Sequence, residues 1–294
     1  MKPQFDNQVL SSFYLWFDNK LGRVGEAFEN YGSQFYPSDN LYQGYYTYAA
    51  PYKQLVADHS IDGATIMSGV HIQSGGGFAF ITSGTNDFSG MNYNEGQLYF
   101  SSEQTGVVSG DYSIKEFSVH LTDQDEGFLL FETKYHRRPK VFEYPTGLPV
   151  NSLTYPAVFI KQETTENVPF SFGGQDETVV NIRAICLADS QFNSDAISSI
   201  FRDSKYDMIP LMPESEMPFN VFGDYRDGQK YNYIDFATGT AHQGSQLYIN
   251  DVKVSRVSYS KMEQKGDFRD INPEVYTAII DFECRIPRFP RSNC

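Results

Sequence analysis

The sequence predicts a mainly β protein of the α+β type, an antiparallel β-sandwich or barrel with an N-terminal helix, an extended aromatic arm and one further short helix. The aromatic content is the first reason, because the 294 residues include 24 Phe and 21 Tyr, which favour strands. The second is that short strand-like runs divided by turn residues continue from about residue 53 onward. This pattern is typical of a sandwich or barrel rather than of alternating strands and helices.

The N-terminal element is predicted to be a helix. From Phe5 onward, apolar side chains recur at spacings of three and four residues, Phe13 and Phe17 among them, which places them on one helix face. Glycine is a poor helix former, so Gly22 and Gly25 predict that the helix ends near residue 21.

Residues 31–52 form a segment rich in Tyr, Gly and Pro that has neither helical nor clean strand periodicity. We expect an extended arm or loop that packs through its aromatic rings. A sugar-stacking platform is the alternative use of such rings, but Tyr is enriched where a chain contacts a partner subunit. The tyrosines of this segment are Tyr31, Tyr36, Tyr42, Tyr45, Tyr46, Tyr48 and Tyr52.

Two strands are clear in the middle of the chain. In residues 114–121, Phe117 and Val119 share one face, and in residues 180–188 every second position from Val180 to Cys186 is apolar. Turns that contain glycine predict hairpins between such runs, because glycine readily adopts the positive φ of a tight turn. The predicted turns are residues 94–96, 125–127, 173–174 and 227–228.

One helix is predicted among these strands, with Ser194 as its N-cap and with Ile197 and Phe201 on one face. A Pro-rich connection from Pro210 to Pro218 follows it. In the run near the C-terminus, apolar residues alternate with mostly polar ones, which predicts a long strand with one buried face. The strand-like runs after the connection are residues 231–236, 246–259 and 275–286.

The chain divides into three segments by composition. Residues 1–52 hold the N-terminal helix and the Tyr-rich arm, and residues 53–209 a β-rich core with one helix. Residues 210–294 supply C-terminal strands that complete the core, followed by a basic tail. The Pro-rich connection is the best candidate for a boundary, and one domain or two are both compatible with this length.

Charge and cysteine content exclude several classes of protein. The formal net charge of −14 argues against sequence-specific nucleic-acid binding. No stretch approaches the roughly 18 to 20 apolar residues of a membrane span, and the N-terminus lacks the pattern of a secretion signal. The three cysteines Cys186, Cys284 and Cys294 are far apart, so we expect free thiols made in a reducing cytoplasm, with the first two in the core.

No motif predicts a catalytic, metal or cofactor site. Residues 75–77 are three glycines without the Gly-Lys-Ser/Thr ending of a phosphate loop, so we expect a hairpin tip. Residues 123–127 begin like a calcium loop, but Lys134 stands where the bidentate Glu is needed, and a turn is the better interpretation. Residues 106–110 have their serine one place late for a nucleophile elbow. The histidines lack zinc-site spacing, and His120 is expected on a solvent face.

Asp281 and Glu283 are the most enzyme-like pair, because glycoside cleavage uses two carboxylates at a fixed separation. Any strand with a solvent face gives this spacing, and Arg285 continues it as an ordinary ion-pair ladder. We therefore do not expect an enzyme.

A basic tail ends this acidic chain, with Arg285, Arg288 and Arg291 and no acid after Glu283. Our hypothesis is that the tail docks on an acidic face of a neighbouring subunit, because arginine pairs with carboxylates in a bidentate manner. Deletion of residues 287–294 tests it, since unchanged assembly would contradict it.

Several stretches carry a family resemblance that covers most of the chain. They are residues 13–18 (Phe-Tyr-Leu-Trp-Phe-Asp) with 25–28 (Gly-Glu-Ala-Phe), 51–54 (Pro-Tyr-Lys-Gln), 169–174 (Pro-Phe-Ser-Phe-Gly-Gly) and 280–288 (Ile-Asp-Phe-Glu-Cys-Arg-Ile-Pro-Arg). In these stretches the chain resembles virion structural proteins of marine and freshwater tailed phages.

The resemblance implies a structural component of a tailed-phage virion, made in the host cytoplasm and assembled with other virion proteins. A neck or head–tail connector protein that forms a homo-oligomeric ring is the first expectation. A tail or baseplate component is the second, and a glycan-binding or depolymerase module of the host-attachment apparatus is the third. The candidates for subunit contacts are Phe13, Trp16, Phe17, Tyr45, Tyr46, Tyr48, Arg285, Arg288, Phe289 and Arg291.

Overall fold

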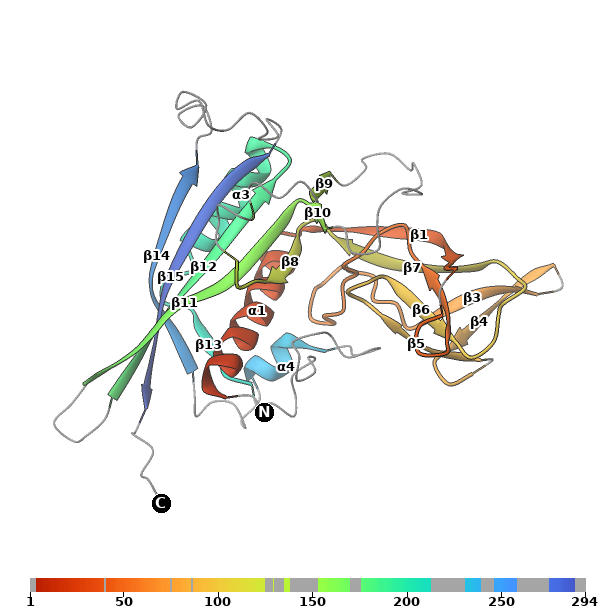
Figure 1. The fold of residues 1–294 in the computed structure, drawn as a ribbon, viewed down its shortest axis with the longest axis horizontal. Coiled ribbons are helices and arrows are strands. Elements are labelled where there is room, and N and C mark those ends of the chain that lie inside the picture. The colour runs from red at the N-terminus through yellow and green to blue at the C-terminus, as the bar shows by residue number, and fades with distance from the viewer. Residues whose placement is uncertain are drawn as a thin grey trace, which may run out of the picture.

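A computed structural model of the chain is mainly β, as the sequence predicts, with an N-terminal helix and further short helices (Figure 1). Most strands belong to two separate sheets of seven and six strands. The structure describes residues 4–39, 41–74, 76–85, 87–124, 129, 135–137, 153–169, 176–212, 231–238, 246–257 and 275–288.

Helix α1 (Phe5–Val24) confirms the predicted N-terminal helix but runs past its expected end. Gly22 lies inside the helix, where the side chain of Ile61 fills the space that a Cβ would need. Gly25 follows the last turn, and its N–H donates to the carbonyl of Leu21 at 3.1 Å.

The seven-stranded sheet is built from the first half of the chain, in the order β4-β3-β7-β1-β2-β6-β5. All its pairings are antiparallel. Its two edge strands are consecutive in the sequence, so the sheet curls into a barrel-like shape (Figure 1). The strands are β1 (Phe28–Pro37), β2 (Tyr46–Ala49), β3 (Gly69–Ser74), β4 (Gly77–Thr82), β5 (Phe88–Asn92), β6 (Gln97–Phe100) and β7 (Val108–Lys115).

The prediction of an extended aromatic arm is wrong for residues 31–37 and 46–49, which lie in strands. Strand β1 pairs along most of its length with β7, and β2 pairs with β1 and β6, so these two strands lie in the middle of the sheet. The strand pattern was hidden because β1 is partly exposed along its whole length except at Phe35, and alternation is therefore weak.

The six-stranded sheet takes five of its strands from the second half of the chain and β8 from the first half, in the order β13-β14-β15-β12-β11-β8. It is not purely antiparallel, because β8 pairs with β11 in parallel, as β9 (Tyr135–Arg137) does with β10 (Leu153–Tyr155) in a small separate ladder. Its strands are β8 (Ser118–Leu121), β11 (Ala157–Pro169), β12 (Asp176–Ala188), β13 (Met208–Pro210), β14 (Gln246–Val257) and β15 (Tyr276–Arg288).

The long strands β12 and β15 follow the predicted alternation. Val180, Ile182, Ala184 and Cys186 are buried on β12, as are Ala278, Ile280, Phe282, Cys284 and Ile286 on β15. Both described cysteines, Cys186 and Cys284, are free and buried, as expected, and burial raises the pKa of both thiols.

The predicted strand 114–121 is divided between the two sheets. Strand β7 ends at Lys115, and β8 begins at Ser118. Between them, the N–H of Glu116 donates to Ala27 at 2.8 Å, which ties the crossing to the start of β1. The chain therefore passes from one sheet to the other within two residues.

Helix α1 lies in the concave face of the six-stranded sheet and between the two sheets (Figure 1). Its apolar residues form an aromatic cluster with the helix α3 (Gln191–Arg202) and with β15. The rings of Phe17 and Phe201 stack with centroids 3.7 Å apart, and the ring of Phe13 meets Phe282 edge-on at 5.0 Å. Trp16 packs on Phe201 at 5.8 Å. The helix is thus a core element of the chain itself.

Two helical predictions need correction. The N-cap of α3 is Ser190, whose hydroxyl accepts from the N–H of Asn193 at 3.1 Å, and Ser194 is buried inside the helix. The strand predicted at 231–236 is helix α4 (Tyr233–Thr238). Its first turn is fixed from outside, because the N–H of Tyr233 donates to the buried carboxylate of Asp58 at 3.1 Å.

Of the predicted turns, residues 94–96 precede β6 as expected, with Gly96 at a φ of +63°. Strands β3 and β4 pair as a hairpin with Ser74 opposite Gly77, so the hairpin predicted at this point is confirmed. The turns at 125–127, 173–174 and 227–228 lie outside the described residues, as does Pro213 to Pro218 of the Pro-rich connection.

Within the described ranges, no helix combines the length and the apolar character needed to cross a bilayer.

Candidate functional site on the outer face of the six-stranded sheet

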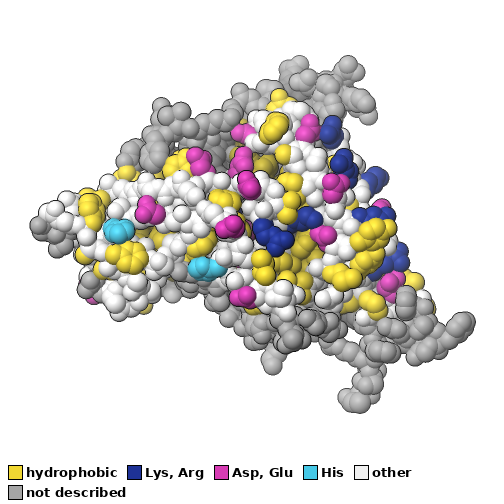
Figure 2. Space-filling model, turned by 180° about the vertical axis from the view of Figure 1, so that it is seen from behind, with side chains coloured by type: hydrophobic (Ala, Val, Ile, Leu, Met, Phe, Trp, Pro, Cys, Tyr) yellow, Lys and Arg dark blue, Asp and Glu magenta, His cyan; other side chains and the backbone are white. Residues whose placement is uncertain are grey.

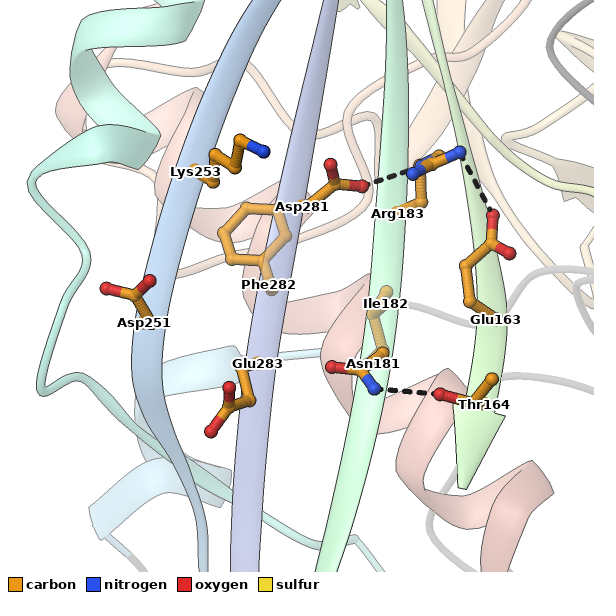
Figure 3. Close-up of a pocket in the computed structure, with 10 residues that line it drawn as sticks. All are labelled: Glu163, Thr164, Asn181, Ile182, Arg183, Asp251, Lys253, Asp281, Phe282 and Glu283. Carbon is orange, nitrogen blue, oxygen red and sulfur yellow. Dashed lines mark hydrogen bonds and ion pairs between the residues drawn. The ribbon is translucent and has the colours of Figure 1, made fainter. Parts of the chain in front are cut away.

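The face of the six-stranded sheet that points away from α1 carries a row of charged and polar side chains. Strands β11, β12, β14 and β15 all contribute to it, and Figure 3 shows the side chains on these four neighbouring strands. They line an open groove of about 360 Å³. The lining residues are Glu163, Thr164, Asn181, Ile182, Arg183, Asp251, Lys253, Asp281, Phe282 and Glu283.

Arg183 is the central cation of the groove. Its Nε lies 2.6 Å from the carboxylate of Asp281 on one side, and its Nη1 lies 3.5 Å from Glu163 on the other (Figure 3). The register of the sheet produces this arrangement, because Arg183 stands directly opposite Asp281. Lys161 adds a second cation to Glu163 at 3.0 Å.

Arg285 makes a second group of ion pairs further along β15. Its guanidinium lies 2.6 Å from Glu283 and 3.0 Å from Glu177. Glu283 also accepts a hydrogen bond of 2.8 Å from Asn250 Nδ2. Hydrogen bonding to Glu283 raises the pKa of Arg285. The surface ion-pair ladder predicted from Asp281, Glu283 and Arg285 is therefore present.

The two carboxylates that most resembled a catalytic pair are both engaged in these ion pairs. A glycosidase would need one of them as a proton donor to the substrate and the other as a nucleophile or base, with space for the sugar between them. The groove instead places an arginine against each carboxylate. Both carboxylates are therefore ion-paired with arginines within the chain.

Figure 2 shows one broad face of the molecule, on which the Lys and Arg side chains gather over the half formed by the six-stranded sheet. Few Lys or Arg side chains are visible on the other half, which is formed by the seven-stranded sheet. The two sheets therefore present surfaces of different character.

A second exposed cluster lies on the seven-stranded sheet. We name residues 41–46 the tyrosine turn. Gln43 and Gly44 both have positive φ, at +50° and +88°, which closes a tight reversal between Tyr42 and Tyr45. Leu41, Tyr42, Tyr45 and Tyr46 are between 36% and 58% exposed. The Tyr42 ring stacks on Tyr99 at 5.2 Å, so at least one ring of the cluster is held in place.

The structure separates the predicted subunit-contact residues into three groups. Phe13, Trp16, Phe17 and Tyr48 are buried in the core of the chain and present no surface to a neighbouring subunit. Tyr45 and Tyr46 are exposed on the tyrosine turn, and Arg285 lies in the ion-pair ladder. Arg288 ends β15, and Phe289 and Arg291 lie outside the described residues.

His120 is not the solvent-facing residue that the sequence suggested. Its Nε2 is buried and finds no hydrogen-bond partner within the described part of the chain, and its ring stacks on Phe159 at 5.4 Å. Burial lowers the pKa of His120 from 6.5 to about 4, with smaller contributions from Lys115 and Lys53.

The other motifs have structural roles where they are described. Residues 108–110 of the serine motif belong to β7, with Ser109 opposite Gln34 of β1. Most of the calcium-like loop lies outside the described residues. Among the residues described, no group of three or more His, Cys, Asp and Glu side chains is placed to hold a metal ion.

Sequence reasoning missed two features. The first is the buried pair Asp18 and Lys115, whose partners are far apart in the chain, so that no local pattern connects them. The second is the exposure of Phe78 and Phe80 on β4. A local signal for the second existed, because no Asp, Glu, Lys or Arg occurs between Asp62 and Asp87.

No known family model matches the chain, and a search of curated proteins finds no match.

Proposed function

We propose that the protein is a structural component of a tailed-phage virion, and that it serves as a neck or head–tail connector protein whose copies contact one another in a ring. The observation that carries this proposal is the tyrosine turn. Four large side chains of one short turn are exposed together, whereas apolar side chains elsewhere on a monomer's surface are usually scattered. Tyrosine is also among the residues enriched in protein–protein contacts.

The charged face of the six-stranded sheet supports the same proposal. Its ion pairs form within one chain. The side chains of several of these pairs remain partly exposed, as in the pairs of Arg285 with Glu177 and Glu283. Such rows of alternating charge favour one register with a neighbour over others, because like charges that meet are strongly unfavourable. Charge patterning of this kind suits the ordered contacts of an assembly.

The net charge of −14 is compatible with a position at the neck, where DNA passes. A like-charged channel wall would not retain the genome as it moves. The sequence resemblance to virion structural proteins of tailed phages is the remaining support, and it favours assembly without fixing the place in the particle.

Two other placements remain as proposals of lower rank. A tail or baseplate component uses the same contact surfaces. A glycan-binding or depolymerase module is favoured by one specific observation, the Tyr42 ring stacked on Tyr99 beside the exposed Tyr45 and Tyr46. Stacked and exposed tyrosines provide the flat apolar surface on which a sugar ring can lie.

Immunoelectron microscopy of density-banded phage particles tests the proposal. An antibody raised against the recombinant chain is expected to label the junction between head and tail. Antibody pre-absorbed with the same chain is the control. Label on the tail tip or baseplate would move the protein to the second placement, and unlabelled particles would contradict a virion role.

A binding assay separates the glycan alternative. Host polysaccharide is titrated into the wild-type chain and into Tyr45→Ser, with the exposed Tyr206→Ser on the other half of the molecule as the matched control. The assembly proposal expects no saturable binding by any of the three. Binding that only Tyr45→Ser loses would favour the glycan-binding module instead.

A further inference from the structure

Strand β4 is an exposed edge of the seven-stranded sheet. It pairs with β3 on one side, from Gly69 opposite Thr82 to Ser74 opposite Gly77. No described strand pairs with its other side. Phe78 is 58% exposed and Phe80 is 52% exposed, so the edge carries two large apolar side chains in water. An edge strand offers a row of backbone donors and acceptors to any strand that approaches it.

This edge lacks the features that usually protect such strands. Natural edges carry a lysine, a proline, an inward-pointing charge or a bulge. Residues 77–82 are Gly-Phe-Ala-Phe-Ile-Thr, with no charge and no proline, and the β3–β4 register has no shift. The surrounding chain is equally neutral, because charged residues are absent between Asp62 and Asp87.

The strand is held in place despite its exposure. Ile81 is buried, and it stands opposite the buried Val70 on β3. On the other face, the Phe80 ring covers Gly69, where a Cβ would collide with the ring, and packs on His71 at 5.0 Å between ring centroids. A fixed strand loses little conformational entropy when it gains a partner, which favours pairing at this edge.

We propose that β4 pairs with β4 of a second copy of this chain, antiparallel and about a two-fold axis at Ala79. The stretch Phe78-Ala79-Phe80 reads the same in both directions. A two-fold axis at Ala79 therefore sets Phe78 of one copy opposite Phe80 of the other. Directly opposite side chains lie on the same face of an antiparallel pair. The four phenylalanines therefore gather into one apolar cluster.

The charge distribution permits a second copy to approach at this edge. Two chains of net charge −14 repel one another over most of their surfaces. The β3–β4 hairpin carries no charged side chain, so two hairpins can approach without placing like charges opposite each other. An isologous contact of this kind closes at two copies, and it is separate from the contacts that would close a ring. The inference does not rest on the proposed function.

The contact is small. At roughly 200 Å² for each phenylalanine and the exposures above, four rings bury about 400 Å². Stable complexes bury about 1,200 to 2,000 Å². We therefore expect a weak, concentration-dependent dimer, which strengthens where other contacts already hold two copies together.

Sedimentation velocity from about 5 µM to about 500 µM measures the association. The wild-type chain is expected to move from its 33.4 kDa monomer toward twice that mass as the concentration rises. Phe78→Lys places two ammonium groups at the contact and is expected to stay monomeric. The matched control is Phe192→Lys, which makes the same change at an 81% exposed residue of α3 and is expected to associate like the wild type.

Disulfide trapping tests the register. In a Cys294→Ser background, Ala79→Cys is expected to give a covalent dimer on mild oxidation, because Cα atoms directly opposite in an antiparallel pair lie about 4.5 to 5.5 Å apart. Thr82→Cys is the control, because the two Thr82 positions are separated by six residues along the pair, about 20 Å. The native Cys186 and Cys284 are buried.

Three results would each overturn the proposal. The first is a wild-type chain that stays monomeric over the whole concentration range. The second is Phe78→Lys associating as the wild type does. The third is Thr82→Cys cross-linking as readily as Ala79→Cys. A far-UV spectrum identical to that of the wild type confirms that each variant is folded.

Discussion

His120 is the residue whose environment departs most from its sequence context. The residue lies on β8 opposite Phe159, and the outer face of the sheet at this end is apolar rather than charged. Leu129, Tyr155, Phe159, Ile185 and Leu187 form a separate buried cluster there. The polar residues near His120 in the sequence suggested a solvent-facing side chain. The imidazole is instead covered by the neighbouring strand β11, which is distant in the sequence.

The pKa of His120 makes the stability of the protein depend on pH. In the unfolded chain the imidazole takes up a proton near pH 6.5, whereas in the folded chain it stays neutral down to about pH 4. Folding therefore loses stability as pH falls through this window, and the loss levels off below about pH 4. At pH 4.5 it amounts to about 2.5 kcal/mol relative to pH 7.

Urea unfolding at pH 7 and pH 4.5 measures this loss in the wild type and in His120→Gln. The variant is expected to lose about 2.5 kcal/mol less than the wild type over that interval, because other titrating groups contribute equally to both. His59→Gln, which removes an exposed imidazole, is the control. A pH dependence in His120→Gln as steep as that of the wild type would contradict the assignment.

At the scale of the elements, the sequence predicted those whose pattern is local and strong. Strand β15 alternates apolar and polar residues along almost its whole length, and helix α1 repeats aromatic residues at helical spacing. In both, one face meets the core and the signal is complete within a single segment. The ion-pair ladder was predictable for the same reason, since Asp281, Glu283 and Arg285 share one face of one strand.

Elements shaped by distant contacts were not predictable. Strand β1 lacks alternation, and its strand character comes from β7, more than seventy residues away. Residues 231–236 carry strand-forming side chains, yet the carboxylate of Asp58 fixes the first turn of α4. Register across such separations also determines which charges meet, so Glu163 and Arg183 could not be joined to Asp281 from the sequence.

Helix α3 gives a prediction at this scale. Ser190→Ala removes the acceptor for the N–H of Asn193, and we expect it to lower the free energy of unfolding by about 1 kcal/mol. The exposed Ser199→Ala, in the same helix, is the matched control and is expected to be neutral or slightly stabilising. Urea denaturation followed by the single Trp16 measures both. Equal stability of the two variants would contradict Ser190 as the N-cap.

At the scale of the whole molecule, α1 joins the two sheets through buried polar groups as well as through its aromatic face. Lys115, the last residue of β7, places its Nζ 2.8 Å from the carboxylate of Asp18 on α1, and Tyr231 donates to the same carboxylate at 3.1 Å. Next to it, Asn19 donates to the buried Asp58 at 2.8 Å. The two sheets therefore share one interior.

This network predicts a large effect on stability. The side chains of Asp18 and Lys115 are only 3% and 10% exposed, so Lys115→Met leaves a buried carboxylate without its cation. We expect a loss of about 3 to 5 kcal/mol in the free energy of unfolding. Lys53→Met is the matched control, because both side chains of the Lys53–Glu95 pair are more than a third exposed. We expect this variant to lose less than about 1 kcal/mol in the free energy of unfolding.

The double variant Asp18→Leu with Lys115→Met separates the cost of an unpaired charge from the worth of the pair. Replacement of both partners by apolar groups removes the stranded carboxylate, so urea denaturation is expected to recover most of the loss. Tyr231 then loses its acceptor, which sets a residual cost of about 1 to 3 kcal/mol. If the double variant were as unstable as Lys115→Met, the loss would come from packing at the junction of the sheets rather than from the buried charge.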